Sequence, residues 1–231
     1  MTLFPGQVPK SELMIDRYLQ LDTTAISDAL ESLGLPGGVA GPLPQSVDVT
    51  LVGFAKTVLL EAIVDPDAST EAGSHILGEA VDTAAVGDVM VIDNLGRSDV
   101  SCWGGLLSLG SVLRGVRGVL ANGAVRDVSE IRRLGFPVYA TGTVPATARG
   151  RLRQRSVGEP VTVWGRTVAA GDLVMVDRTG LVVVPRSRAA EVLDIAAGFC
   201  EREKSIAADI SSGIGLTRAM HDARLAGDAE R

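Results

Sequence analysis

The stretch Gly118-Val119-Leu120-Ala121-Asn122-Gly123-Ala124-Val125-Arg126-Asp127 decides how this chain is organised. A short apolar run ends at small residues, and the charged pair Arg126-Asp127 follows directly, before the helical spacing of residues 128–134. A strand that leads into a helix in this way is typical of α/β sheets, whose binding sites lie at the carboxyl ends of the strands. The small residues 122–124 let a ligand approach the backbone closely. The stretch therefore predicts an α/β fold with a site at Arg126-Asp127.

Arg126 and Asp127 are suited to binding a small anionic ligand. A guanidinium recognises a carboxylate through two parallel hydrogen bonds, and a neighbouring carboxylate can hold a hard cation. Together the two groups could bind and polarise a small α-keto acid. The alternative is a structural pair in which Asp127 caps the following helix, which is a common use of aspartate. The residues by themselves leave both interpretations open.

The segment Trp103-Gly104-Gly105-Leu106-Leu107 is the candidate second wall of the same pocket. A glycine pair that opens a helix leaves the first N–H groups unpaired, and such a helix start binds a carboxylate or phosphate. A glycine pair is also a weakly specific signal. A plain helix start packed on the core is therefore an equally good interpretation.

Two similar strands frame these segments. Residues 87–93 and 171–177 each begin with a Gly-Asp turn and continue as an apolar run. Apolar strands of this kind suit a sheet buried on both faces, and the helical segments between them predict βα crossovers. Turn chemistry by itself explains the recurrence as well as an internal repeat does.

The remaining elements follow from periodicity and from capping residues. We expect a helix that starts at Asp22 and stops at Gly34, and a long helix that is capped by Ser187 and reaches about Ile210. Further helices are expected over residues 70–85, 106–113 and 128–134, strands over 49–64, 89–93, 119–121, 138–140 and after 160, loops over 36–47 and 93–99, an arm over 1–10 and a tail over 211–231.

Composition excludes several classes of function. The 231 residues are 46% hydrophobic, which is enough for one large domain, and the net charge of −6 with 3% aromatic residues argues against nucleic-acid binding. No apolar run reaches the length of a membrane span, and the N-terminus lacks the pattern of a signal peptide. Cys102 and Cys200 form no disulfide framework, so we expect a cytoplasmic protein.

Other chemically interesting residues have ordinary interpretations. His75 and His221 lack metal-ligand spacing, and Cys102 is expected to be a buried thiol rather than a nucleophile. The basic run at 149–155 is expected to be a solvated rim, although it could attract an anionic substrate or an acidic subunit. The sequence contains no GxGxxG, GxxxxGK[ST], HExxH or GxSxG motif, which argues against nucleotide-dependent chemistry and serine hydrolysis.

Several blocks of the sequence together resemble one family, the 4-hydroxy-4-methyl-2-oxoglutarate aldolases, which also includes the regulator of ribonuclease E activity A. The similarity covers about residues 22–210 and is carried by residues 87–89, 103–107, 118–119, 123–127, 136–138, 171–173 and 177–180. It implies an α/β fold of the swivelling β/β/α sandwich type with flanking N- and C-terminal helices. It also implies one domain over residues 1–231 and a homotrimer or hexamer.

The resemblance further implies a class II lyase that uses Mg²⁺ or Mn²⁺ to cleave a 4-hydroxy-2-oxo acid to pyruvate. Oxaloacetate decarboxylation is implied as a side activity, because both reactions pass through a pyruvate enolate. In this scheme Arg126 binds the substrate and stabilises the enolate, and Asp127 holds the metal. The substrate carboxylate binds at the helix start formed by Gly104, Gly105, Leu106 and Leu107. Glu203 of a neighbouring subunit is the candidate that completes the site.

The chain departs from the family at Gly105. Active aldolases of this family usually carry an acidic residue twenty-one positions before the arginine, where it orients metal-bound waters, and here that position is a glycine. Asp99 or Asp93 from the adjacent loop is the candidate replacement. The departure keeps two alternatives open: a lyase or isomerase that acts on another sugar acid, and a non-catalytic binding or regulatory protein.

Overall fold

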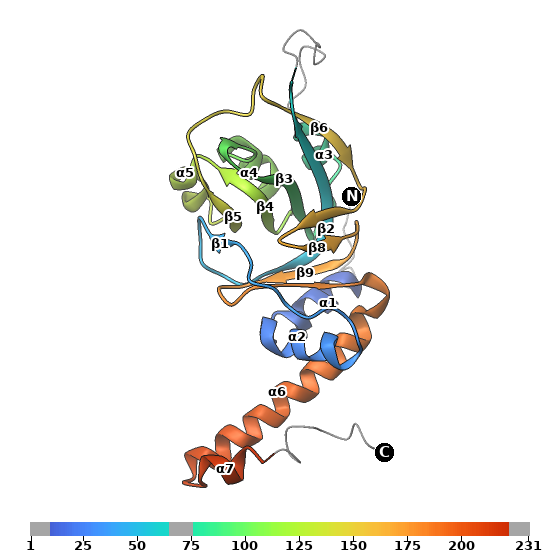
Figure 1. Ribbon diagram of the computed structural model, residues 1–231, viewed down its shortest axis with the longest axis vertical. Coiled ribbons are helices and arrows are strands. Elements are labelled where there is room, and N and C mark those ends of the chain that lie inside the picture. The colour runs from blue at the N-terminus through green and yellow to red at the C-terminus, as the bar shows by residue number, and fades with distance from the viewer. Residues whose placement is uncertain (1–9, 65–75, 222–231) are drawn as a thin grey trace, which may run out of the picture.

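The computed structural model describes residues 10–64 and 76–221, and a curled eight-stranded sheet forms its centre (Figure 1). The strand order is β1-β5-β4-β3-β2-β9-β10, and β6 pairs with β2. The strands are β1 (Leu43–Pro44), β2 (Leu51–Ala62), β3 (Asp88–Ser101), β4 (Gly118–Val125), β5 (Val138–Thr143), β6 (Leu152–Val157), β9 (Leu173–Val176) and β10 (Leu181–Val184), with β7 (Val161–Val163) and β8 (Arg166–Val168) as a separate hairpin.

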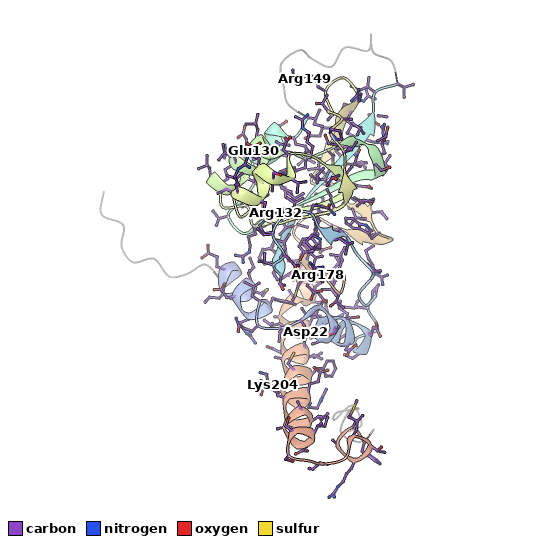
Figure 2. The ribbon with its side chains drawn as sticks, turned by 90° about the vertical axis from the view of Figure 1, so that its left-hand side faces the viewer. Asp22, Glu130, Arg132, Arg149, Arg178 and Lys204 are labelled. Atoms are coloured by element: carbon purple, nitrogen blue, oxygen red, sulfur yellow. The ribbon has the colours of Figure 1, made fainter. Side chains whose placement is uncertain are left out.

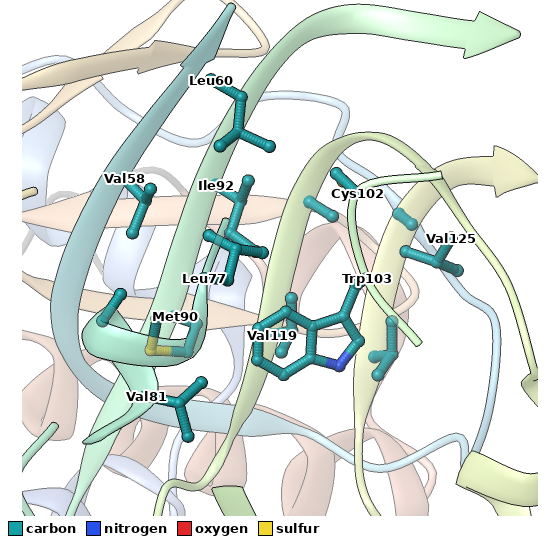
Figure 3. Packing of buried hydrophobic residues seen from close by; sticks show 14 of the residues in the cluster. Val58, Leu60, Leu77, Val81, Met90, Ile92, Cys102, Trp103, Val119 and Val125 are labelled. Carbon is teal, nitrogen blue, oxygen red and sulfur yellow. The ribbon is translucent and has the colours of Figure 1, made fainter. Parts of the chain in front are cut away.

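The parallel part of the sheet is built from βα crossovers, as the sequence predicts. Strands β2, β3, β4 and β5 are parallel neighbours, and α3 (Gly78–Asp82), α4 (Gly105–Leu113) and α5 (Val128–Arg133) connect them. One hydrophobic cluster joins these helices to the sheet, and Figure 3 shows the Trp103 indole within it. The Trp103 and Phe136 rings stack at 6.5 Å. This packing holds the starts of α4 and α5 against the end of β4.

Most of the remaining helices pack at the β9–β10 side of the sheet. They are α1 (Lys10–Tyr18), α2 (Thr23–Ser32), the 3-10 turn η1 (Arg186–Arg188) and the first half of α6 (Ala189–Ser211). The short helix α7 (Leu216–Ala219) packs instead on the far end of α6 (Figure 1). Asp22 caps α2 by accepting a hydrogen bond from the Ala25 N–H, as predicted. The far half of α6 projects out of the body of the molecule (Figure 1).

Several predicted boundaries are wrong. Residues 93–99 are not a loop, because β3 continues through them to Ser101 with left-handed backbone at Leu95 and Gly96. Ser187 does not cap α6: it lies inside η1, and no side chain caps the long helix. Helix α1 begins at Lys10, where an arm was expected, and residues 1–9 lie outside the described part. The expected helix over 70–85 is the short α3 within the described residues, which begin again at 76.

The two Gly-Asp turns have the same local structure. Asp88 accepts a hydrogen bond from the Ala85 N–H at 2.8 Å, and Asp172 accepts one from the Ala169 N–H at 2.9 Å. The strands that follow both pair with β2, but β3 is parallel to it and β9 is antiparallel. The two segments therefore share their turn chemistry but not the direction of their strands within the sheet.

Candidate functional site

The Arg126-Asp127 pair lies where β4 ends and α5 begins. The segment that leads into α4 runs beside this strand end: Cys102 donates its N–H to the Ala124 carbonyl at 2.9 Å, and Arg126 donates its N–H to the Trp103 carbonyl at 3.0 Å. These two hydrogen bonds bring the glycine pair next to Arg126 and Asp127. The structure therefore joins the two segments that the sequence predicts to line one pocket.

Asp127 has an unusual backbone and an unusual partner. Its φ of 56° and ψ of 32° place a non-glycine residue in the left-handed region, and such backbone strain is concentrated at functional sites. Asp127 precedes α5 in the N-cap position, but its side chain makes no capping bond. The carboxylate instead accepts a hydrogen bond from the Gly105 N–H at 3.1 Å. Asp127 therefore occupies the N-cap position of α5, as the capping interpretation predicts, but its side chain does not cap the helix.

Arg126 lies against the same carboxylate. Its Nε is 3.4 Å from Asp127 Oδ2, and both side chains are 39% exposed. A contact at that distance leaves most of the guanidinium donors for a ligand, since a guanidinium carries five N–H groups. The pair thus presents a positive fork and a carboxylate to solvent at one strand end.

Helix α4 directs unpaired backbone donors at this position. Gly104 is its N-cap, and the first hydrogen bond of the helix runs from the Ser108 N–H to the Gly104 carbonyl. The N–H groups of Leu106 and Leu107 have no partner among the described residues. The positive end of the helix dipole lies here, so the start of α4 suits an anion. A Cβ on Gly104 would lie 2.7 Å from Asp127 Oδ2, which shows how closely the two segments approach.

Glu130, which was not among the residues predicted from the sequence, also reaches the glycine pair. A Cβ on Gly105 would overlap the Glu130 carboxylate and lie 3.0 Å from its Oε1. Glu130 is exposed, and its side chain makes no hydrogen bond or ion pair with another residue of the described chain. The sequence signal that could have identified Glu130 is its position three residues after Asp127 at the start of a helix, because residues three apart lie on the same helix face.

The predicted replacements for the missing acid at 105 are engaged elsewhere. Asp93 is buried and accepts hydrogen bonds from the Leu95 N–H at 2.8 Å and from Asn122 Nδ2 at 2.9 Å. Asp99 pairs with Arg97 through two hydrogen bonds. Asp93 thus has a structural role: it lies within β3 and stabilises the left-handed backbone at Leu95.

The other candidates also have structural roles or lie away from the site. Cys102 is buried, and desolvation raises the pKa of its thiol to about 12, so it is not a nucleophile at neutral pH. Arg153 and Arg155 of the basic run share Glu61 on an exposed surface, as expected for a rim. His75 lies outside the described residues.

Glu203 is not part of the site within one chain. Figure 2 shows Glu130 on the body of the molecule and Lys204, the neighbour of Glu203, far along the projecting helix α6. Contact between Glu203 and Arg126 would therefore require a second copy of the chain.

Two features of the described residues as a whole bear on ligands and membranes. Across residues 10–64 and 76–221, no three or more His, Cys, Asp or Glu side chains gather in a way that could hold a metal. No helix in the described part of the chain is long and apolar enough to cross a membrane.

The fold and this strand-end site define an α/β protein with a curled sheet and flanking helices. The family model for RraA-like proteins, described as Aldolase/RraA, matches residues 23–183, and the chain belongs to that family. This confirms the family resemblance and the fold class.

Two curated relatives illustrate the range of the family. Protein DlpA of Legionella pneumophila is 29% identical over 90% of this chain, but the matched region is 33% of DlpA, so the chain spans about a third of that relative. A protein of Halalkalibacterium halodurans named "Putative 4-hydroxy-4-methyl-2-oxoglutarate aldolase" is 28% identical over 78% of this chain and 80% of its own length.

Two solved structures share the fold over most of the chain. An uncharacterised protein of Pseudomonas syringae is 30% identical, with a TM-score of 0.81 over 95% of this chain and 98% of its own. Streptomyces coelicolor RraAS2, described as an unusual member of the RNase ES inhibitor RraA family, is 27% identical, with a TM-score of 0.75 over 83% of this chain and 95% of its own.

Proposed function

We propose that this chain is a divalent-metal-dependent lyase that cleaves a 4-hydroxy-2-oxo acid to pyruvate and also decarboxylates oxaloacetate. The observation that carries the proposal is the Asp127 carboxylate, held beside Arg126 at the unpaired N–H groups of α4. The aldolase name of the Halalkalibacterium halodurans relative supports it.

The residues present fit Mg²⁺ or Mn²⁺. Mg²⁺ is commonly bound through one or two carboxylates and keeps several waters. Asp127 supplies such a carboxylate, 39% exposed, and the absence of a side chain at Gly104 lets it lie beside the start of α4. When bound, the cation would act as a Lewis acid on the keto group of the substrate.

The protein groups have separable roles in the reaction. The N–H groups of Leu106 and Leu107 bind the substrate carboxylate, and the Arg126 guanidinium stabilises the negative charge that develops on the keto oxygen. Loss of the proton of the 4-hydroxyl allows the C3–C4 bond to break, and its electron pair forms the enolate. Protonation at C3 then gives pyruvate, while C4 leaves as a carbonyl compound. Decarboxylation of oxaloacetate passes through the same enolate.

We propose further that the protein assembles as a homotrimer or hexamer. Leu106, Leu109, Val112 and Leu113 leave an exposed apolar face on α4, with Leu106 and Leu113 82% and 79% exposed. Such a face is typical of a subunit interface. It begins at the proposed site, so a neighbouring copy that covers it could bring Glu203 near Arg126.

One alternative has a specific observation in its favour. Gly105 stands where active relatives usually carry an acid, and a member of this family that has lost catalysis would bind or regulate without turnover. RraAS2 is described as belonging to an RNase ES inhibitor family. Metal and oxalate binding distinguish the two functions, because a protein-only interface requires neither.

The decisive experiment is a keto-acid screen with Mg²⁺ or Mn²⁺ and coupled pyruvate detection, together with calorimetric titration of metal and oxalate. We expect pyruvate from oxaloacetate or a 4-hydroxy-2-oxo acid. Arg126→Ala should lower kcat/KM by about 100-fold or more, because it removes the positive charge at the developing enolate. Arg133→Ala, on the exposed side of α5, is the matched control and should retain activity. A wild-type protein that binds neither metal nor oxalate would exclude the lyase.

A further inference from the structure

Position 105 carries no acid, but the carboxylate of another residue lies next to it. The three nearest heavy atoms to a Cβ built on Gly105 all belong to the carboxyl group of Glu130. Gly105 itself has no positive φ, so its backbone would accept a side chain. The space that an acid at 105 would enter is therefore occupied by an acid that comes from α5.

Glu130 and Asp127 reach the same glycine from one turn of chain. Asp127 accepts a hydrogen bond from the Gly105 N–H at 3.1 Å. The Glu130 carboxylate lies where a Cβ of the same residue would be. Two carboxylates that both approach one residue repel each other unless positive charge lies nearby. The start of α4 and Arg126 supply part of that charge, and a cation held by Asp127 would supply the rest.

We infer that Glu130 is the second carboxylate of the site, a positioning residue that orients the waters of a cation held by Asp127 in place of the absent acid at 105. This rests on the proposed metal-dependent function. Neither Asp93 nor Asp99 fills the role, because the first is bonded to Asn122 and the Leu95 N–H and the second to Arg97. Glu130 has no such partner in the described part of the chain.

Binding of Mn²⁺ in the absence of substrate tests the inference without turnover. Glu130→Gln keeps the size of the side chain and removes its charge, so we expect Mn²⁺ affinity to fall about tenfold, as for other outer ligands of metal sites. Water-proton relaxation of the bound Mn²⁺ should change as well, since an amide oxygen replaces the anionic acceptor of the waters. Glu159→Gln, an exposed carboxylate between β6 and β7, is the matched control and should match wild type.

Moving the acid from position 130 to position 105 gives the most specific test. Glu130→Ala vacates the space at Gly105, so the double variant Gly105→Asp/Glu130→Ala should regain the affinity and relaxation that Glu130→Ala loses. A purely structural role for Glu130 would not be rescued from another helix. If wild type binds Mn²⁺ and Glu130→Gln matches it in affinity and relaxation, the inference is overturned while the lyase stands. If wild type binds no Mn²⁺, the proposed function and the inference both fail.

Discussion

At the scale of single residues, the site depends on a strained aspartate and two glycines. The left-handed backbone of Asp127 turns its carboxylate away from its own helix and onto the Gly105 N–H. Gly104 makes this possible, because any side chain there would meet Asp127 Oδ2. Strain and close approach therefore act together to fix one carboxylate beside Arg126.

Asp127→Asn tests the charge without disturbing the backbone. Asparagine adopts left-handed conformations readily and can still accept the Gly105 N–H, so the fold should persist. Mn²⁺ affinity should fall about tenfold or more, because the anionic ligand is lost. Calorimetry with Mn²⁺ and circular dichroism measure the two effects. Unchanged metal binding and activity would show that Asp127 is not the metal ligand.

Gly104→Ala tests the close approach. Gly104 has an extended backbone that any residue adopts, so the expected damage comes from displacement of the Asp127 carboxylate rather than from strain. We expect weaker Mn²⁺ binding with the overall fold retained. Gly142→Ala on β5 is the matched control, since a Cβ there meets no atom within 4 Å. Equal Mn²⁺ affinity in the two variants would contradict this explanation.

At the scale of elements, the Gly-Asp turns set the start of two central strands. Asp88 bonds to the Ala85 N–H, whereas Asp172 bonds both to the Ala169 N–H and to the Arg186 N–H. The second turn thus connects the start of β9 to the turn η1 that precedes α6. The two turns have similar sequences, but the Asp172 side chain makes one more hydrogen bond than the Asp88 side chain does.

The two turns can be compared by alanine substitution. A hydrogen bond contributes about 1 kcal/mol to stability, so Asp172→Ala should lower the free energy of unfolding by about 2 kcal/mol and Asp88→Ala by about 1 kcal/mol. Urea denaturation measures both values. A larger loss from Asp88→Ala would mean that the bond from Asp172 to the Arg186 N–H contributes little.

At the scale of the whole molecule, two surfaces are placed where a second copy of the chain could reach them. The apolar face of α4 is exposed beside the site, and the far half of α6 projects from the opposite end of the body (Figure 1). A second copy could cover the first and receive the second. The proposed contribution of Glu203 depends on that arrangement.

Leu113→Glu tests whether α4 lies in a subunit interface. Leu113 is 79% exposed, so the charge costs little in a single chain, but burying it between subunits would be unfavourable. We expect light scattering to show a smaller assembly than wild type. Leu43→Glu, at the 59% exposed Leu43 on β1, is the control and should leave the assembly intact. A wild-type monomer would exclude the proposed oligomer.

The sequence by itself determined the α/β class, the crossovers around β2 to β5, and the Arg126-Asp127 pair at a strand end. Periodicity, capping residues and turn chemistry are local, so they can be read from neighbouring residues. The course of β3 through residues 93–99 was missed, because sheet pairing overrides local turn signals. Only the tertiary structure decided that Asp127 contacts the start of α4 and that Glu130 fills the space at Gly105. Those contacts join residues 22 and 25 positions apart, and the backbone hydrogen bonds of Cys102 and Arg126 together with the packing of Trp103, rather than any local preference, bring them together.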